Sequence, residues 1–471
     1  TSVLKAMGVL NLVSSSGTLR ASKPLLEFSL NPSAQPQRTR EVRKALKSLE
    51  KRGIITYRDF SDEYRVWQGS DYDLHGSIEI ARSEAQGLSL VEVLNRTVEL
   101  SPAVAGRHSQ QRGTLRVFDK MFVDKSALNT VIEVGEEFDG RILLATEPLQ
   151  TKELGSVPSS KPLVCAIPHD IKGVRDLAVE VRALTVAIER AREGEADWVA
   201  LRELSERLSI ARLELNQRVF EAWLPRNSQW ISTVVSQAGG STKVISLPPE
   251  GTVSSHLSIV SDDNYGMAPR IANEMLARRE LTSQGAKARR LLIEALIQQN
   301  DQETIGLAGY GPERAMYEAL LRTPGFHRKV KDEWRVTEPA DPDWKRLWKR
   351  LSNAVQETSI ERKTVAELVS PLKQPPFGLK DGLLPVLVVA LLIEQADDVA
   401  LYEHGSLVLG LDDAVAERLA KNPTNFAVKF VGATKGLRRS VVQALASELE
   451  MVTPTGEPTF LQVVRAVFAW L

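Results

Sequence analysis

The chain has 471 residues, of which 43% are hydrophobic and 25% are charged, and its 60 basic residues balance 60 acidic ones. This length and composition predict a globular protein of two to four domains. Zero net charge argues against a uniformly basic nucleic-acid coat protein, although a local concentration of charge can still create a DNA-binding patch.

Residues 1–72 predict a winged helix, which consists of three helices followed by a β-hairpin. Apolar residues recur at helical spacing before a Ser/Gly break, and "SKPLLEFSL" then begins like a capped second helix. A third helix directs Val42, Leu46 and Leu49 inward. Two strand-like runs around a polar tip at Ser61 and Asp62 complete the module as its wing.

The next two segments differ in their patterns. Residues 73–172 predict a mixed α/β domain, because short apolar runs such as "RILLAT" and "PLVCAIP" lie near helical segments. Residues 173–225 predict an antiparallel helical hairpin, because two seams of apolar residues flank the polar break "REGEAD". We expect that hairpin to be a structural arm.

The remaining chain is predicted to be mainly helical. Residues 226–360 form a helical domain, in which "APRIANEMLARRELTSQGAKARRLLIEALIQQ" is a helix, a break and a second helix, and "DPDWKRLWKRLSNAVQE" is an amphipathic helix. Residues 361–471 predict a second winged-helix-like domain, with two strand-like runs around His404 and Gly405. The predicted fold class is therefore α+β, mainly α with small β elements, in several domains.

Cysteine usage and hydropathy indicate the compartment. Cys165 is the only cysteine, which excludes an intramolecular disulfide and a cysteine-based zinc site and favours a reducing cytoplasm. The most apolar run, Gly382 to Gln395, is too short to span a bilayer and contains Pro385. It predicts a buried helix and no membrane partner.

The motifs of common catalytic sites are missing from the sequence. It contains no GxxxxGK(S/T) phosphate loop, no HExxH and no GxSxG, and its six histidines are scattered. No catalytic residue, metal site or cofactor is therefore predicted within this chain.

Basic residues are the best candidates for a binding site. From Arg38 to Arg58 the chain has eight basic and two acidic residues, a net charge of +6. The third helix and the wing are therefore predicted to contact DNA phosphates. The predicted contacts are Arg38, Arg40, Arg43, Lys44, Lys47, Lys51, Arg58 and Arg65. Acidic Asp62 and Glu63 at the wing tip oppose DNA, so a winged helix that packs against a neighbouring domain is an equal alternative.

A second basic cluster lies in the predicted helical domain. It comprises Arg270, Arg278, Arg279, Lys287, Arg289 and Arg290. These residues could form a basic ridge for nucleic acid, but an ordinary solvated helical face is the more common arrangement. Aromatic residues do not interleave with either cluster, which disfavours single-strand binding.

Three stretches together resemble a known protein group. They are "VLKAMGVLNL…LEKRGIITYRDFSDEYRVWQGSDYDL", "APRIANEMLARRELTSQGAKARRLLIEAL" with "GYGPERAMYEALL", and "PPFGLKDGLLPVLVVALLIEQADDVALYEHGSLVLGL". The chain resembles the region after the ATPase domain in large bacterial P-loop NTPases of phage-defence islands, similar to the BREX-type BrxC/PglY group. The resemblance covers most of the chain but its motifs are structural. It implies that ATP binds a domain preceding Thr1, and the absence of an initial Met agrees with a longer polypeptide.

These observations lead to three functional hypotheses. The first is a non-catalytic DNA-binding and partner-coupling portion of a bacterial anti-phage defence NTPase, with double-stranded DNA and other defence-system proteins as partners and a homo-oligomer as a compatible state. The second is a protein-interaction scaffold in which the winged helices are docking modules. The third is a DNA-binding transcriptional regulator, which requires a dimer and symmetric half-sites.

Overall fold

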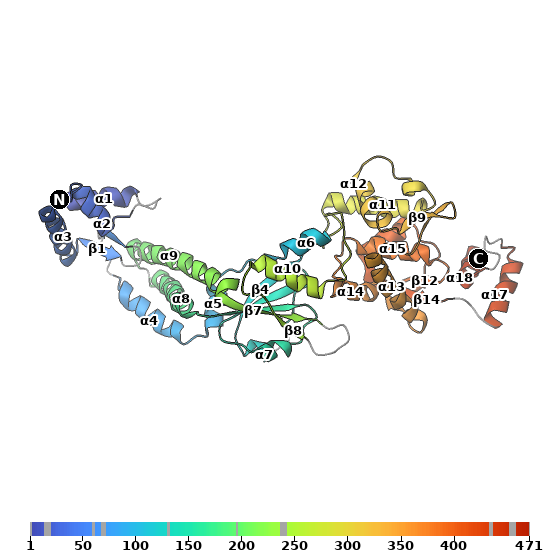
Figure 1. Cartoon of the computed structure of the whole chain (residues 1–471), viewed down its shortest axis with the longest axis horizontal. Coiled ribbons are helices and arrows are strands. Elements are labelled where there is room, and N and C mark those ends of the chain that lie inside the picture. Colours follow the sequence, from blue (N-terminus) through green and yellow to red (C-terminus); the bar gives the residue numbers. More distant parts are fainter. Residues whose placement is uncertain are drawn as a thin grey trace. The chain divides into compact units, whose positions relative to one another are not determined.

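The computed structural model describes residues 2–13, 20–58, 62–66, 72–129, 132–194, 196–235, 243–432, 437–451 and 458–470 (Figure 1). Helices predominate and the strands form several separate sheets, which confirms the predicted α+β class. The chain folds as two compact units. The first comprises Thr1–Leu100 and Pro168–Asn227, and the second comprises Ser101–Ile167 and Ser228–Leu471.

The first unit begins with three helices and a β-hairpin, in the order that the sequence predicts. These elements are α1 (Ser2–Val13), α2 (Lys23–Leu30), α3 (Pro36–Lys51), β1 (Ile55–Arg58) and β2 (Glu63–Val66). The strands pair antiparallel, with Ile55 opposite Val66. Met7, Leu26 and Leu46 are buried at the centre of this module, one from each helix. The predicted hairpin tip includes Ser61, which lies outside the described residues.

Local signals explain where these elements begin and end. The Ser22 hydroxyl accepts a hydrogen bond from the Leu25 amide and so caps α2, and a proline occupies the first turn. Gly53 has φ of 65°, a left-handed conformation that favours glycine, and it turns the chain from α3 into β1.

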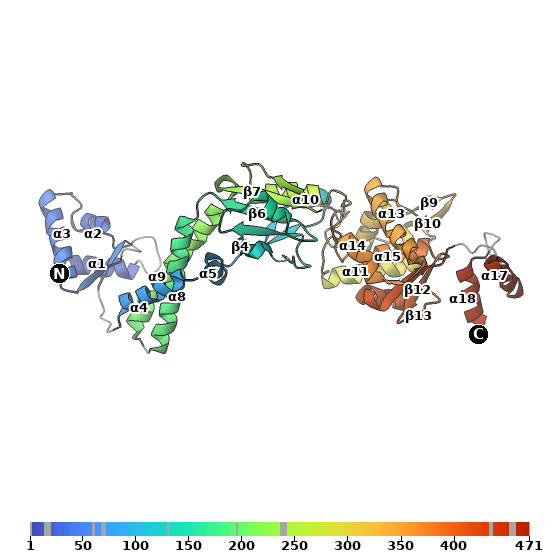
Figure 2. The same ribbon diagram turned by 90° about the horizontal axis from the view of Figure 1, so that it is seen from below.

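Four further helices complete the first unit. They are α4 (Leu74–Gln86), α5 (Leu90–Thr97), α8 (Lys172–Glu193) and α9 (Trp198–Ala222). The helices α8 and α9 lie side by side and antiparallel, which confirms the predicted helical hairpin (Figures 1 and 2). Both α4 and α5 pack against α8, and Arg190 of α8 pairs with Glu84 of α4 at 2.7 Å. Residues 73–100 therefore belong with the hairpin, and their predicted place in an α/β domain is wrong.

A six-stranded sheet opens the second unit, in the order β3-β4-β5-β6-β7-β8. Its strands are β3 (Ala103–Val104), β4 (Val117–Val123), β5 (Gly140–Ala145), β6 (Leu163–Pro168), β7 (Ser228–Val234) and β8 (Lys243–Ser246). The central strands β4, β5 and β6 are parallel, while β3 and β8 pair antiparallel with their neighbours. Three helices accompany the sheet: α6 (Gly106–Arg112), α7 (Thr151–Gly155) and α10 (Val253–Asn264).

The sheet corrects the predicted boundary at residue 225. Strands β7 and β8 follow the helical hairpin in sequence, yet they complete a sheet that begins before it. The sequence "SQWISTV" begins with two polar residues and ends with a valine, and its apolar residues do not alternate with polar ones. Its strand character therefore comes from pairing with β6.

The rest of the second unit surrounds a continuous hydrophobic core that runs from Ile271 to Val428 and includes Leu292, Trp348 and Leu387. Its elements are α11 (Ser283–Gln298), α12 (Pro312–Tyr317), β9 (His327–Val330), β10 (Glu333–Val336), α13 (Pro342–Gln356), β11 (Lys363–Thr364), α14 (Val365–Lys373), α15 (Leu384–Glu394), β12 (Val399–Glu403), β13 (Ser406–Leu407), α16 (Asp413–Lys421) and β14 (Phe426–Phe430). A predicted domain boundary between residues 360 and 361 would cut this core.

Two predicted helices in this region have different outcomes. The amphipathic helix α13 is confirmed, with Trp344, Leu347 and Leu351 buried. The helix predicted before the Ser/Gly break is wrong, because residues 268–282 form turns and loops. Asn273 accepts a hydrogen bond from the Leu276 amide through its side chain at 3.1 Å, a local bond that competes with helix formation.

The C-terminal part contains the predicted turn and an unpredicted strand. His404 and Gly405 have φ of 48° and 86°, as the two-residue turn between β12 and β13 requires. Strand β14 was not predicted, and it pairs with both β11 and β12. The last helices, α17 (Leu437–Glu448) and α18 (Phe460–Trp470), share a small separate core.

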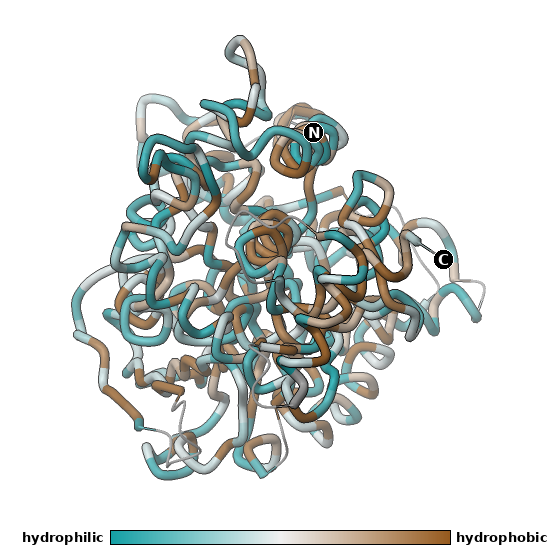
Figure 3. Tube along the Cα trace, turned by 90° about the vertical axis from the view of Figure 1, so that its right-hand side faces the viewer, coloured by the Kyte–Doolittle hydropathy of each residue, from teal (hydrophilic) through white to brown (hydrophobic). Residues whose placement is uncertain are grey.

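Hydrophobic and hydrophilic residues alternate along the helical turns of the chain trace (Figure 3), as amphipathic helices require. The exception is α15, whose residues are almost all buried, as the sequence predicts. Among the described helices, none is both long and apolar enough to cross a bilayer.

Candidate DNA-binding helix and its docked hairpin

Helix α3 carries a row of basic side chains, which we call the α3 stripe. It consists of Arg40, Lys44, Lys47 and Lys51, and all four residues are exposed. Their spacings of four, three and four residues place them on one face of an α-helix. The opposite face carries buried Val42 and Leu46. Packing of the apolar face therefore directs the basic face to solvent.

The α3 stripe is not neutralised by neighbouring acids. Within the described residues, none of its four cations forms an ion pair. The stripe runs from Arg40 to Lys51, a rise of about 16 Å along the helix axis. Duplex DNA presents about ten phosphate charges over that length. An array of uncompensated cations on a packed helix is therefore suited to bind a polyanion.

Arg43 lies beside the stripe but has a different role. Its guanidinium donates two hydrogen bonds to the Glu27 carboxylate of α2, at 2.6 and 3.0 Å. The hydrogen bond from Arg43 lowers the pKa of Glu27 more than any other contact does. Arg43 thus connects α3 to α2, while Arg38, at the start of α3, is exposed.

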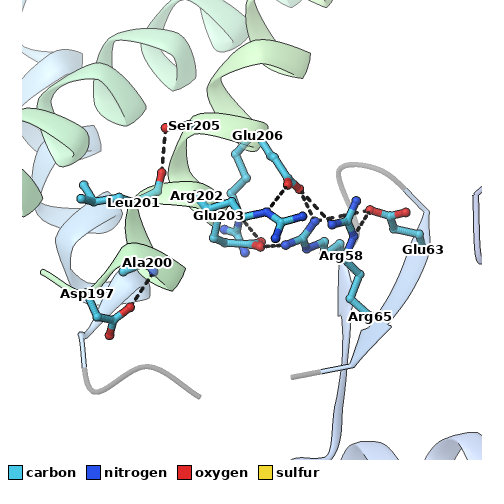
Figure 4. A network of polar contacts seen from close by, with 11 residues as sticks. Arg58, Glu63, Arg65, Asp197, Ala200, Leu201, Arg202, Glu203, Ser205 and Glu206 are labelled. Carbon is cyan, nitrogen blue, oxygen red and sulfur yellow. Dashed lines mark hydrogen bonds and ion pairs between the residues drawn. The ribbon is translucent and has the colours of Figure 1, made fainter. Parts of the chain in front are cut away.

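The two DNA contacts predicted on the hairpin, Arg58 and Arg65, lie against α9. Arg58 of β1 is only 8% exposed, and its guanidinium bonds to Glu203 and Glu206 of α9 (Figure 4). Arg65 of β2 bonds to Glu63 at 2.9 Å and lies 3.5 Å from Glu206. The buried Arg58 guanidinium cannot reach a phosphate, and the partly exposed Arg65 is already engaged by Glu63 and Glu206. Arg58 and Arg65 are therefore removed from the predicted contact set.

These residues form a network of alternating charges around buried Arg58, Glu63 and Glu203, which we call the docking network. Arg58 also lies 3.4 Å from Glu63, which is itself 4% exposed. From α9, Arg207 bonds to Glu203 at 3.1 Å and Arg202 bonds to Glu206 at 3.0 Å. Every carboxylate of the network faces at least two cations. The network therefore attaches the β1–β2 hairpin to α9 without leaving a buried charge unpaired.

The docking network should make the first unit sensitive to acid. Burial raises the pKa of Glu206, but the hydrogen bond from Arg202 and the charge of Arg58 outweigh burial, so the net pKa is lowered from 4.5. A carboxylate with a lowered folded-state pKa adds stability above its unfolded pKa, and this stability is lost as the pH falls through the folded value.

We therefore predict that the free energy of unfolding of the first unit falls as the pH drops below about 4.5. A urea titration repeated from pH 7 to pH 3 measures this fall. The Glu206→Gln variant should lose less stability over the same range. Equal losses in both proteins would show that Glu206 does not cause the pH dependence.

Sequence reasoning missed the acidic half of the network. Glu203 and Glu206 lie on α9, far from Arg58 in sequence, and nothing in the pattern identifies their partner. One signal was present: Glu203 adjoins Leu204, Leu208 and the rest of an apolar seam. A carboxylate at the edge of a buried face needs a cation.

The second predicted basic cluster does not form one surface. Arg270, Arg278 and Arg279 lie in loops rather than on a helix, and Arg279 pairs with Glu136 at 3.2 Å. On α11, Arg290 pairs with Glu294 at 3.4 Å and Arg289 is half-buried. Lys287 is exposed. The predicted ridge is absent because its first helix is absent.

The second unit has its own buried ion pair, which sequence reasoning also missed. Arg116 is fully buried and bonds to Asp139 at 2.9 Å, and Lys380 bonds to both carboxylate oxygens of Asp139 at 2.8 Å. Burial raises the pKa of Asp139, but the charges of Arg116 and Lys380 outweigh it and lower the net value. Arg116 also donates to the Gly378 carbonyl at 2.6 Å and lies over the Tyr265 ring. Through these bonds the cluster connects the sheet to the segment after α14.

Among the described residues, no group of three His, Cys, Asp or Glu side chains could hold a metal ion. No protein-family model, curated protein or solved structure matches the chain.

Proposed function

We propose that the chain binds double-stranded DNA through α3, which acts as the DNA-contacting helix of a winged helix formed by α1–α3 and the β1–β2 hairpin. The α3 stripe carries this proposal, because its cations are exposed, aligned and without acidic partners in the described structure. Binding releases condensed counterions from the phosphates and needs no base-specific contact. The ligand is duplex rather than single-stranded, because no aromatic side chain interrupts the stripe.

The same module would couple DNA to the rest of the protein. Its hairpin is attached to α9 by the docking network, so a force or displacement at α3 would reach the α8–α9 pair through a rigid contact. The chain would then be the non-catalytic, DNA-binding and partner-coupling portion of a bacterial anti-phage defence NTPase in the cytoplasm. ATP would bind a separate domain, and α8–α9 would contact other defence-system proteins.

A protein-interaction scaffold is the second candidate. The observation that favours it is Arg58, because this wing already contacts protein rather than nucleic acid. In that case the C-terminal hairpin β12–β13 would also be a docking element. A transcriptional regulator is a third candidate, and it requires a dimer, which a molar-mass measurement in solution tests.

The first test separates DNA binding from scaffolding. The purified chain is titrated against a fluorescently labelled 24-base-pair duplex and against the corresponding single strand at low salt, with anisotropy as the readout. The proposal predicts binding to the duplex that added salt reverses. Absence of duplex binding at low salt, together with a stable protein complex, would favour the scaffold.

A further inference from the structure

A groove of about 240 Å³ lies between α11 and α16 in the second unit. Small side chains create it, since Ala286 of α11 faces Ala416 and Ala420 of α16, and Ile293 forms part of the floor. Larger residues at these alanines would bring the two helices into full contact. The groove is thus an apolar trough between two helices, a shape that accepts an amphipathic helix.

Arg289 forms part of the groove wall and forms no ion pair within the described residues. Its guanidinium donates one hydrogen bond, to the Gly382 carbonyl at 3.2 Å. The Asp381 carboxylate attracts Arg289 electrostatically, but its ion pairs are with Lys373 at 2.6 Å and Arg279 at 3.9 Å. Burial lowers the pKa of Arg289, but an arginine stays charged at neutral pH. A half-buried guanidinium that has five donors and makes one hydrogen bond in the described structure leaves several donors for a ligand.

Four other charged side chains that line the groove form ion pairs with one another. Arg290 pairs with Glu294 at 3.4 Å, and Lys421 pairs with Glu417 at 2.6 Å, so these four side chains neutralise one another. Lys287 adjoins Arg289 in sequence and has no ion pair in the described structure. Lys287, Arg289 and Asp413 are the charged lining residues outside these two ion pairs, so the end of the groove around Lys287 and Arg289 is positive.

The opposite end of the groove has an unpaired acceptor. Asp413, at the start of α16, bonds to Gln298 through Oδ2, while its Oδ1 is buried and without a hydrogen-bond partner. Gln298 is nine residues after Arg289 on α11, which corresponds to about 13 Å along the helix. A ligand that satisfies both ends must therefore be extended over more than two helical turns.

We propose that this groove binds a helical segment of a partner protein, with an apolar side chain on the alanine floor, a carboxylate on Arg289, and a hydrogen-bond donor about two turns away on Asp413. Charge complementarity at Arg289 and Lys287 selects an acidic segment over a neutral one. The distance between the two polar ends selects a helix over a small carboxylic acid. This inference does not depend on the proposed DNA binding, since the groove and the α3 stripe belong to different units.

The test uses the full chain as bait for a phage-displayed library of 14-residue peptides rich in helix-favouring residues. We expect the selected peptides to share an apolar face and at least one acidic residue. Replacing that residue by glutamine in a synthetic copy should weaken binding about tenfold or more. Short-chain carboxylic acids should not compete at the same concentration.

Three variants and a control assign the binding to the groove. Ala420→Leu fills the trough and Arg289→Met removes the guanidinium, and each should reduce binding of the acidic peptide about tenfold or more. Lys287→Gln changes an exposed side chain, so the fold should be kept. This variant should reduce binding of the acidic peptide several-fold. Arg346→Met, on the exposed face of α13, is the matched control and should leave binding unchanged. Selected peptides without acidic residues, equal binding to all variants, or no enrichment would each overturn the proposal.

Discussion

Replacing Arg40, Lys44, Lys47 and Lys51 together by glutamate is expected to weaken duplex-DNA binding at least about a hundredfold at moderate salt. The variant removes four cations that face solvent and substitutes four charges that repel phosphate. The apolar face of α3 is unchanged, so the module should keep its fold. Anisotropy titrations of both proteins at one fixed salt concentration measure the ratio of affinities, and circular dichroism checks the helix content.

A matched variant separates a local contact from the effect of net charge. Helix α13 carries four exposed cations, Lys345, Arg346, Lys349 and Arg350. Their replacement by glutamate changes the net charge of the chain by the same amount but leaves the α3 stripe intact. We expect this variant to bind within a few-fold of the unmodified chain. An equal loss in both variants would mean that DNA responds to total charge and not to α3.

Replacing Arg58 by methionine is expected to destabilise the first unit by about 3–5 kcal/mol. Methionine keeps the apolar part of the side chain but removes the cation that Glu63 and Glu203 share, which leaves each buried carboxylate with a single partner, Arg65 or Arg207. Removal of one member of a buried ion network is costly because the remaining charges are desolvated and only partly compensated. Amide hydrogen exchange in β1, β2 and α9 reports the loss, since opening of the docked hairpin exposes these elements.

Two further variants test whether the cost comes from the buried carboxylates that Arg58 bridges. Adding Glu63→Gln and Glu203→Met to Arg58→Met removes the buried negative charge and should restore a large part of the stability. Arg212→Met, at an exposed position of the same helix, should change stability by less than about 0.5 kcal/mol. An Arg58→Met variant as stable as Arg212→Met would show that the hairpin is not held by the docking network.

The basic residues of α3 and those of the β1–β2 hairpin have different roles because they differ in burial. The sequence between Arg38 and Arg65 presents its cations as one group. In the structure, the residues on the outer face of α3 stay in solvent without partners, while Arg58 and Arg65 turn inward to carboxylates of α9. One module thus offers a surface for a polyanion and a separate surface for docking. The two acidic residues of the wing, Asp62 and Glu63, would repel DNA phosphates. The structure accounts for Glu63, because its carboxylate belongs to the docking network.

Periodic elements were predictable from sequence because their burial follows a single period. The α8–α9 pair, α13 and α15 have apolar residues at helical spacing or along their whole length, and each forms as expected. The order of three helices and a hairpin in residues 1–72 was predictable from the cap at Ser22 and the turn at Gly53. The predicted contact set contains all four residues of the α3 stripe, but it also contains Arg43, whose pairing with Glu27 was not predicted.

Features that depend on long-range contacts were not predictable. Strands β7 and β14 acquire their structure by pairing with strands distant in sequence. The turns at residues 268–282 replace a predicted helix because Ile271 bonds to the carbonyl of Arg112 and Asn273 bonds to its own segment. The burial of Arg58 depends on Glu203, which is 145 residues away. Propensity and periodicity contain no information about such partners.

The salt dependence of duplex-DNA binding tests the central claim most directly. Affinity is measured from about 50 to 200 mM salt for the unmodified chain and for a variant with alanine at the four stripe positions. Each phosphate contact contributes about 0.9 to the log–log slope, so four contacts predict a slope steeper by about 3.6 in the unmodified chain. Equal slopes in the two proteins, or no binding at 50 mM, would contradict the assignment of α3 as the DNA-contacting helix.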